Sequence, residues 1–287
     1  MYITITGKLG SGKSTVCNLL VERCGYQVYS TGKIQRGIAE RMGISTLELN
    51  QLMMSNPQYD NLIDNETVRI SKESIGQDLL FDSRLAFHFV EESFKIFAYV
   101  SPMEAAKRVF GDSKRGAVES YRDVMDARDQ LLKRSEVENE RFKEMYHLDN
   151  LDYNNYNLVI DTTWVTPERI ADEILRALEA YKADKDVRML SFSPKCLYPT
   201  MDFDSLDAAL IEEWTGRMKN GEMPSLDAVG IVRRGPLHYC VKGMEYVVAA
   251  LRAGKDFISG QTVTEDNGSN ASDLTPYQEA GNFEYKD

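Results

Sequence analysis

A glycine-rich segment near the start of the chain, residues 7–15, constrains the fold more than any other stretch. It reads Gly-Lys-Leu-Gly-Ser-Gly-Lys-Ser-Thr and fits the pattern G-x-x-x-x-G-K-S/T. Residues 2–6 before it are β-branched and aromatic, as expected of a buried strand, and apolar side chains recur at helical spacing after Lys13. A glycine turn between a strand and a helix N-terminus surrounds a phosphate with backbone N–H groups. The segment therefore predicts a P-loop that binds a nucleoside triphosphate.

The residues of this loop have distinct expected roles. Those expected to bind ATP are Gly7, Gly10, Ser11, Gly12, Lys13, Ser14 and Thr15. Lys13 is expected to reach the β- and γ-phosphates, and the hydroxyl of Ser14 is expected to bind Mg²⁺. A plain connecting turn would not need the added lysine and hydroxyl. A dinucleotide-binding loop would need the spacing G-x-G-x-x-G, which this segment does not have.

Composition and charge set the broad class. With 287 residues the chain is long enough for one large domain or two ordinary ones, and its hydrophobic content of 43% is compatible with a globular core. No apolar run approaches the ~20 residues that span a bilayer, and the chain starts with a predicted strand rather than a secretion signal. The four cysteines are scattered, and the net charge of -11 disfavours a general nucleic-acid surface. We expect a soluble cytoplasmic protein with reduced thiols that does not bind membranes.

Further strands alternate with helices along the first two-thirds of the chain. Apolar segments at residues 27–30, 78–84, 94–100 and 158–163 are typical of strands, and helical patterns lie between them. This alternation predicts a five-stranded parallel sheet with helices on both faces, the three-layer α/β fold of P-loop NTPases. Asp82 and Arg84 follow one strand at the edge where such sheets bind ligands. We expect Asp82 to contact Mg²⁺ and Arg84 to hold a phosphate; the alternatives are a turn residue and half of a surface ion pair.

Two helical segments add to this alternation. Residues 33–75 contain a helical insertion that we expect to hold the acceptor, and Arg36 is placed early on its first helix to grip a second phosphate. Residues 112–148 contain a long charged helix in which Arg134 and Arg141 lie two turns apart and share a face. Such a helix is either a solvated surface or a lid that closes positive charge over a transferring phosphoryl group.

Taken in order, these features resemble the short type of cytidylate kinase, a group within the nucleoside monophosphate kinases. The resemblance covers residues 1–182. It rests on residues 7–15, Ser30-Thr31-Gly32 with Arg36, residues 60–64, Asp82-Ser83-Arg84-Leu85-Ala86, Arg134 with Arg141, and residues 146–149 and 156–163. It implies ATP- and Mg²⁺-dependent transfer of a phosphoryl group to a nucleoside monophosphate, with CMP or dCMP first among the acceptors.

The resemblance also implies roles for individual residues. Lys13, Arg134 and Arg141 would act on the transferred phosphoryl group. The acceptor nucleotide would be contacted by Ser30, Arg36, Asp64 and Arg84.

The chain departs from that family's pattern at Gln35, Ser83 and Ser135. These residues stand where the short cytidylate kinases have an aromatic residue, a glycine and an acid. Two alternatives therefore stay open. One is a nucleotide-sensing module with little kinase turnover, and the other is a kinase that acts on another small molecule.

The remaining residues predict a second unit after a charged linker at residues 183–186. Residues 183–264 read as a small α+β domain: a helix over 206–219, paired strands at 228–232 and 237–241, and a helix over 243–255. This order weakly resembles the N-terminal module of ParB-type partition proteins and its sulfiredoxin-like relatives. Glu245 and Tyr246 stand where that module has a histidine and an arginine, so the resemblance implies a fold and no activity. We expect this domain to offer a surface for a protein partner, and residues 265–287 to form a flexible polar tail.

Overall fold

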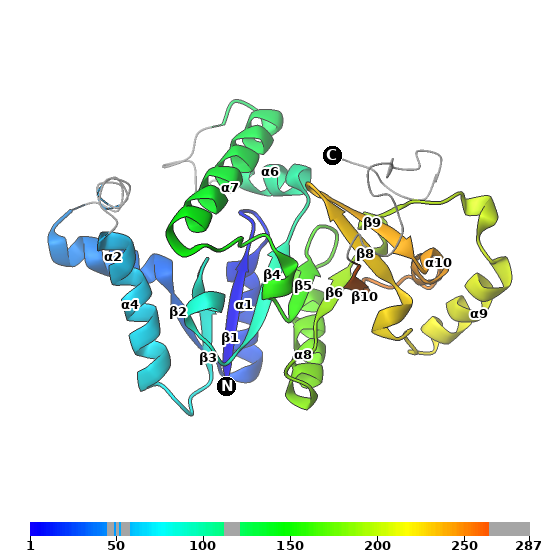
Figure 1. Cartoon of the computed structure of the whole chain (residues 1–287), viewed down its shortest axis with the longest axis horizontal. Helices are drawn as coiled ribbons and strands as arrows, with labels where there is room; N and C mark the ends of the chain where they lie inside the picture. Colours follow the sequence, from blue (N-terminus) through cyan, green and yellow to red (C-terminus); the bar gives the residue numbers. More distant parts are fainter. Residues whose placement is uncertain (45–48, 50–51, 53–57, 112–120, 264–287) are drawn as a thin grey trace.

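The computed structural model describes residues 1–44, 49, 52, 58–111 and 121–263. Within them the chain forms an α/β fold in which a mostly parallel sheet carries helices on both sides (Figure 1). The elements of the first part are β1 (Tyr2–Gly7), α1 (Lys13–Cys24), β2 (Gln27–Ser30), α2 (Thr31–Met42), α4 (Gln58–Glu73), β3 (Leu79–Asp82), α5 (Ala86–Phe89), β4 (Ser93–Tyr99), α6 (Pro102–Phe110), α7 (Val124–Tyr146), β5 (Leu158–Asp161) and α8 (Pro167–Ala183).

The five predicted strands are all present and form the expected parallel sheet. Their order is β2-β3-β1-β4-β5, and every neighbouring pair is parallel. Asp82 pairs in register with Ile5 on β1 and with Ser30 on β2. Because parallel strands end at the same edge of a sheet, the P-loop after β1 lies beside the ends of β2 and β3.

Helices α1 and α8 pack against each other and cover one face of this sheet (Figure 1). Helix α1 starts after Gly12, which has a φ of 76°, and it ends at Gly25, whose N–H donates to the carbonyl of Val21. Helix α8 starts with Pro167 after Thr166, whose hydroxyl accepts from the N–H of Arg169. A glycine after the last turn and a threonine before a proline are common signals of helix ends.

The sheet continues beyond the five predicted strands. Strand β6 (Met189–Phe192) lies parallel to β5, with Leu158 opposite Met189. Strand β10 (Ile258–Thr262) pairs antiparallel with β6. Within the described residues the sheet has ten strands in the order β2-β3-β1-β4-β5-β6-β10-β8-β9-β7. Strand β6 belongs to the part of the sequence that was assigned to the second domain. It covers the edge that β5 would otherwise expose.

The C-terminal part forms the predicted helix, hairpin and helix, together with strands that the sequence pattern did not reveal. After β6 its elements are β7 (Leu197–Pro199), α9 (Ala208–Lys219), β8 (Gly230–Arg234), β9 (Leu237–Lys242), α10 (Met244–Arg252) and β10. One hydrophobic core joins this part to the first part, because Phe97 on β4 and Tyr153 belong to the same buried cluster as Ile231 and Ile258. The two predicted units therefore share both a sheet and a core.

Two further findings concern the described ranges only. None of their helices combines the length and the apolar character needed to cross a membrane. Their histidine, cysteine and acidic side chains form no group of three or more that is placed to hold a metal ion. The predicted tail at residues 265–287, and residues 112–120 of the predicted lid, lie outside the described residues.

Candidate active site

The P-loop follows β1 and passes close to the backbone of two neighbouring elements. Gly7 has a φ of 145°, and a Cβ atom there would lie 2.2 Å from the carbonyl oxygen of Ala98 on β4. Gly10 has a φ of 79°, and a Cβ atom there would lie 2.9 Å from the carbonyl oxygen of Ala105 on α6. Only glycine fits these two positions without displacing backbone. The loop is thus fixed between β4 and α6.

Hydrogen bonds inside the loop converge on one carbonyl group. The carbonyl oxygen of Lys8 accepts from the Ser11 N–H at 3.3 Å, from the Ser11 hydroxyl at 2.8 Å and from Lys13 Nζ at 3.3 Å. Lys13 Nζ also donates to the carbonyl of Gly7 at 3.1 Å. The ammonium group of Lys13 is therefore held against the loop, while the side chains of Ser14 and Thr15 are exposed.

The charge on Lys13 is sensitive to its surroundings. Burial, together with the smaller effect of the neighbouring Arg84, lowers the pKa of Lys13 to about 8. The carboxyl group of Asp82 acts in the opposite direction. Lys13, Arg84 and Asp82 therefore lie close enough to influence one another, as the sequence predicts for the ends of β1 and β3.

Helix α7, which contains most of the predicted lid, contacts this edge of the sheet through Glu138. The carboxylate of Glu138 forms an ion pair with Arg84 and a second one with Arg134, whose Nε lies 3.3 Å from Glu138 Oε1. A small cavity of about 40 Å³ remains between the P-loop, α6 and α7. Its lining residues are Lys8, Leu9, Arg84, Pro102, Ala105, Leu131, Leu132, Ser135 and Glu138. The arginine predicted to hold the acceptor and one arginine of the predicted lid thus meet at a single carboxylate beside the P-loop.

Three further predicted site residues, Asp64, Arg141 and Arg36, lie on the helical insertion and on the lid helix. Asp64 on α4 accepts a hydrogen bond from the hydroxyl of Tyr146 at the end of α7, so the helical insertion contacts the lid helix. The guanidinium carbon of Arg141 lies 5.5 Å from the centre of the Phe142 ring. The side chain of Arg36 lies outside the described residues, so its phosphate contact stays a prediction.

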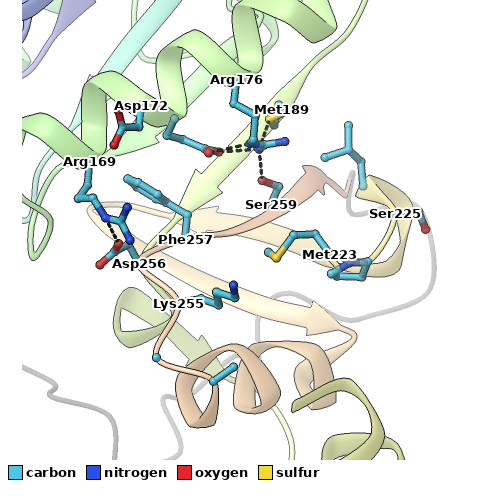
Figure 2. A pocket seen from close by; sticks show the side chains of 15 residues that line it. Arg169, Asp172, Arg176, Met189, Met223, Ser225, Lys255, Asp256, Phe257 and Ser259 are labelled. Carbon is cyan, nitrogen blue, oxygen red and sulfur yellow. Dashed lines mark hydrogen bonds and ion pairs between the residues drawn. The ribbon is translucent and has the colours of Figure 1, made fainter. Parts of the chain in front are cut away.

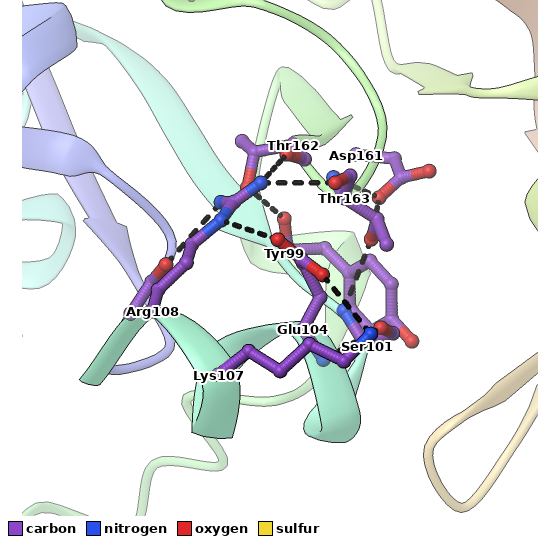
Figure 3. A network of polar contacts seen from close by, with 9 residues as sticks. Tyr99, Ser101, Glu104, Lys107, Arg108, Asp161, Thr162 and Thr163 are labelled. Carbon is purple, nitrogen blue, oxygen red and sulfur yellow. Dashed lines mark hydrogen bonds and ion pairs between the residues drawn. The ribbon is translucent and has the colours of Figure 1, made fainter. Parts of the chain in front are cut away.

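Arg108 on α6 is a site residue that the sequence analysis missed (Figure 3). Its Nη1 donates to the carbonyl of Gly10 at 3.3 Å, and its Nη2 donates to the carbonyls of Thr162 and Thr163 at 2.8 and 2.9 Å. Its Nε bonds to Glu104 at 3.2 Å. Arg108 therefore connects the P-loop to the segment after β5. In the sequence, Glu104 and Arg108 look like an ordinary helical ion pair, so only the fold reveals this role.

Asp161 at the end of β5 is a second buried group near the site. One of its oxygens accepts hydrogen bonds from the N–H and the hydroxyl of Thr163, and the other accepts from the N–H of Ser193 at 3.2 Å. Burial raises the pKa of Asp161, although these hydrogen bonds oppose the change. Asp161 thus connects Thr163, in the segment that Arg108 also binds, to Ser193 at the start of the C-terminal part.

A larger cavity of about 490 Å³ lies away from the P-loop, between α8 and the C-terminal strands (Figure 2). Arg169 is paired there with Asp256 at 2.8 Å, and Arg176 is paired with Glu173 at 2.6 Å. None of the predicted site residues lines this cavity. The predicted groups that come together do so at the P-loop, which is the candidate active site.

Comparison with known proteins identifies the family of the chain. The sequence model of the cytidylate kinase-like family matches residues 2–164. The chain belongs to this family. A cytidylate kinase from Halobacterium salinarum is 33% identical over 188 residues, which cover 65% of this chain and 93% of that protein. A cytidylate kinase from Thermoplasma acidophilum is 32% identical over 201 residues, which cover 69% of this chain and all of that protein.

A further relative reaches beyond the P-loop part of the cytidylate kinase-like chain. An S-adenosylmethionine-dependent nucleotide dehydratase from Lacinutrix mariniflava is 28% identical over 239 residues. The match covers 81% of this chain but only 47% of that protein, so more than half of the dehydratase has no counterpart here. A match of this extent includes residues after 182. Part of the C-terminal region therefore has a matching segment in another protein, together with part of residues 1–182.

Proposed function

We propose that this protein transfers a phosphoryl group from ATP to a nucleoside monophosphate, with CMP and dCMP the first acceptors to test. The observation that carries the proposal is the meeting of Arg84 and Arg134 at Glu138, beside the loop that holds Lys13. Phosphoryl transfer depends mainly on positioning and on neutralising negative charge. A P-loop lysine and arginines from two other elements supply this charge from separate directions.

The residues of the site also fit the two groups that the reaction needs. Gly10 and Gly12 take positive φ values in a loop that begins a helix, the setting in which backbone N–H groups bind phosphates. Oxygen ligands suit Mg²⁺, and the exposed hydroxyl of Ser14 and the carboxylate of Asp82 would supply them. Bound Mg²⁺ would neutralise charge on the β- and γ-phosphates. The ammonium group of Lys13 would then donate hydrogen bonds to phosphate oxygens instead of to the carbonyls of Gly7 and Lys8.

The acceptor would bind on the other side of the same edge. Arg84 and Arg134 would leave Glu138 and bind phosphate oxygens, which an arginine can contact with two parallel hydrogen bonds. Ser30 at the end of β2, and Arg36 and Asp64 in the helical insertion, are the proposed acceptor contacts. The named activity of the dehydratase relative concerns a nucleotide, which favours a nucleotide over other small molecules as the acceptor.

The experiment is an acceptor panel. Purified protein is incubated with ATP and Mg²⁺ and with each common ribo- and deoxyribonucleoside monophosphate, and the products are separated by anion-exchange chromatography. We expect CDP or dCDP to form fastest. A protein that forms no diphosphate from any acceptor, while it remains folded and binds ATP, would remove the kinase proposal.

A nucleotide-sensing module is the second candidate. It is favoured by the contact of Glu138 with Arg84 and Arg134, which leaves a cavity of only about 40 Å³ at the site. It is also favoured by the core that the C-terminal part shares with the P-loop part, because such a core can transmit the state of the loop. Tight ATP binding with negligible turnover on the whole panel would support this candidate over the kinase.

A further inference from the structure

The C-terminal hairpin reaches the strand that supports the P-loop. Strands β8 and β9 are joined by a turn at Gly235 and Pro236, and the carbonyl of Pro236 accepts a 2.7 Å hydrogen bond from the hydroxyl of Tyr99. Tyr99 is the last residue of β4, which lies beside β1. The start of β9 is accordingly seen near the end of β4 (Figure 1). The hairpin is thus tied to the edge of the sheet that carries the candidate active site.

The ring of Tyr99 also contacts the P-loop itself. Lys8 Nζ lies 4.7 Å from the centre of this ring, which is within the range of a cation–π interaction. The N–H of Lys8 donates to the carbonyl of Ala98, the residue before Tyr99, at 3.2 Å. The carbonyl of Lys8 is the group on which Ser11 and Lys13 converge. A contact that holds Lys8 in place therefore also helps to hold the ammonium group of Lys13, which donates to the Lys8 carbonyl.

Two rings of the C-terminal part, those of His238 and Phe192, pack against the Tyr99 ring. The imidazole of His238 on β9 packs edge-on at 4.5 Å between centroids, and the ring of Phe192 on β6 lies 5.5 Å away. His238 is 1% exposed and shares a 2.9 Å hydrogen bond with the hydroxyl of Tyr153. Burial lowers the pKa of His238 well below its usual value, so the imidazole is neutral and does not repel Lys8.

We propose that Tyr99 is a positioning residue through which the β8–β9 hairpin fixes Lys8, and through Lys8 the P-loop, in the shape that binds ATP. The chain of contacts runs from the Pro236 carbonyl to the Tyr99 hydroxyl, from the Tyr99 ring to Lys8, and from the Lys8 carbonyl to Lys13. The C-terminal part then contributes to nucleotide affinity without touching the nucleotide. The inference rests on the proposed function only in requiring that the P-loop binds ATP.

A double-mutant cycle in the full chain tests this inference. Tyr99→Phe removes the hydroxyl group and keeps the ring, and we expect it to weaken ATP binding about threefold, the effect of losing one net hydrogen bond. Lys8→Met removes the cation above the ring. If Tyr99 acts through Lys8, Tyr99→Phe has no further effect on ATP affinity in the Lys8→Met background. The dissociation constant for ATP is measured by titration calorimetry.

Tyr181→Phe is the matched control. The hydroxyl of Tyr181 is also buried and donates to a backbone carbonyl of β4, that of Ser93 at 3.1 Å, but at the opposite end of the strand. We expect both single tyrosine variants to lower the melting temperature, and only Tyr99→Phe to weaken ATP binding. Unchanged ATP affinity in Tyr99→Phe, or an equal loss in the presence and absence of Lys8, would overturn the inference. ATP binding without transfer to any acceptor would instead remove the proposed kinase function and leave this inference standing.

Discussion

The contact of Glu138 with two arginines leads to a prediction that differs from the usual effect of removing a charge near an active site. In the structure, Glu138 holds the guanidinium groups of Arg84 and Arg134. A phosphate that needs these arginines must first displace the Glu138 carboxylate. Glu138→Gln keeps the size of the side chain and removes its charge. We therefore expect this variant to bind the monophosphate acceptor more tightly than the wild-type protein does.

The size of this effect follows from the exposure of the ion pairs. The side chains of Arg84 and Glu138 are 29% and 22% exposed, and that of Arg134 is 48% exposed. Partly exposed ion pairs contribute up to ~1 kcal/mol each. Removal of ~1 kcal/mol of competing interaction corresponds to a gain in acceptor affinity of roughly fivefold. The same change is expected to lower the free energy of unfolding by a similar amount, because the pairs also join α7 to the end of β3.

The assay is calorimetric titration of CMP into the protein, together with chemical denaturation of each variant. Glu136→Gln is the control. Glu136 is exposed and lies on the same helix two residues away, and its replacement removes the same charge. We expect Glu136→Gln to leave acceptor affinity unchanged. Unchanged or weaker CMP binding in Glu138→Gln would refute the idea that this carboxylate competes with the acceptor phosphate.

Three other predictions concern the P-loop and its support. Lys13→Met is expected to lower turnover by at least about 100-fold in a coupled kinase assay, with a circular dichroism spectrum like that of the wild type, because it removes the cation that meets the transferring group; a loss below tenfold would contradict the role of Lys13. Since the pKa of Lys13 is about 8, its ammonium group is lost as the pH rises through that value, so calorimetry should show ATP affinity falling between pH 8 and 9.5 and proton uptake on binding near pH 8.5. A flat pH profile there, in a protein whose melting temperature is unchanged, would count against this assignment. Arg108→Ala removes three hydrogen bonds to backbone carbonyls, so we expect it to lower the free energy of unfolding by about 1–3 kcal/mol and to weaken ATP binding. Chemical denaturation and ATP titration measure these two effects. Arg122→Ala is the control, because the side chain of Arg122 is exposed.

The sequence was most informative where local spacing decides the structure. The P-loop and the first five strands follow from patterns within a few residues. The parallel order of the strands then places Ser30, Asp82 and the P-loop at one edge without further information. For the same reason, the predicted proximity of Asp82 and Arg84 to Lys13 agrees with the electrostatics of the structure.

The features that the sequence did not predict depend on contacts between distant segments. Strand β6 has only four residues and lies buried on both faces, so it shows no alternating pattern that would mark it as a strand. Glu138 lies one helical turn from Arg134 and looks like a surface ion pair; its contact with Arg84, 54 residues away, exists only in the folded chain. The hydrogen bond between Tyr99 and Pro236 joins positions 137 residues apart. No single-sequence pattern encodes such pairings.

The account depends on Lys13, Arg84 and Arg134 serving one site for phosphoryl transfer. The most direct measurement is a crystal structure of the protein with a bisubstrate analogue in which adenosine and cytidine are joined through five phosphates. The account predicts that the P-loop surrounds the phosphates on the adenosine side and that Arg84 and Arg134 have left Glu138. Arg84 then contacts phosphate oxygens on the cytidine side, and Arg134 contacts phosphate oxygens in the middle of the bridge. An analogue bound elsewhere, or bound at the P-loop with both arginines still paired to Glu138, would contradict it.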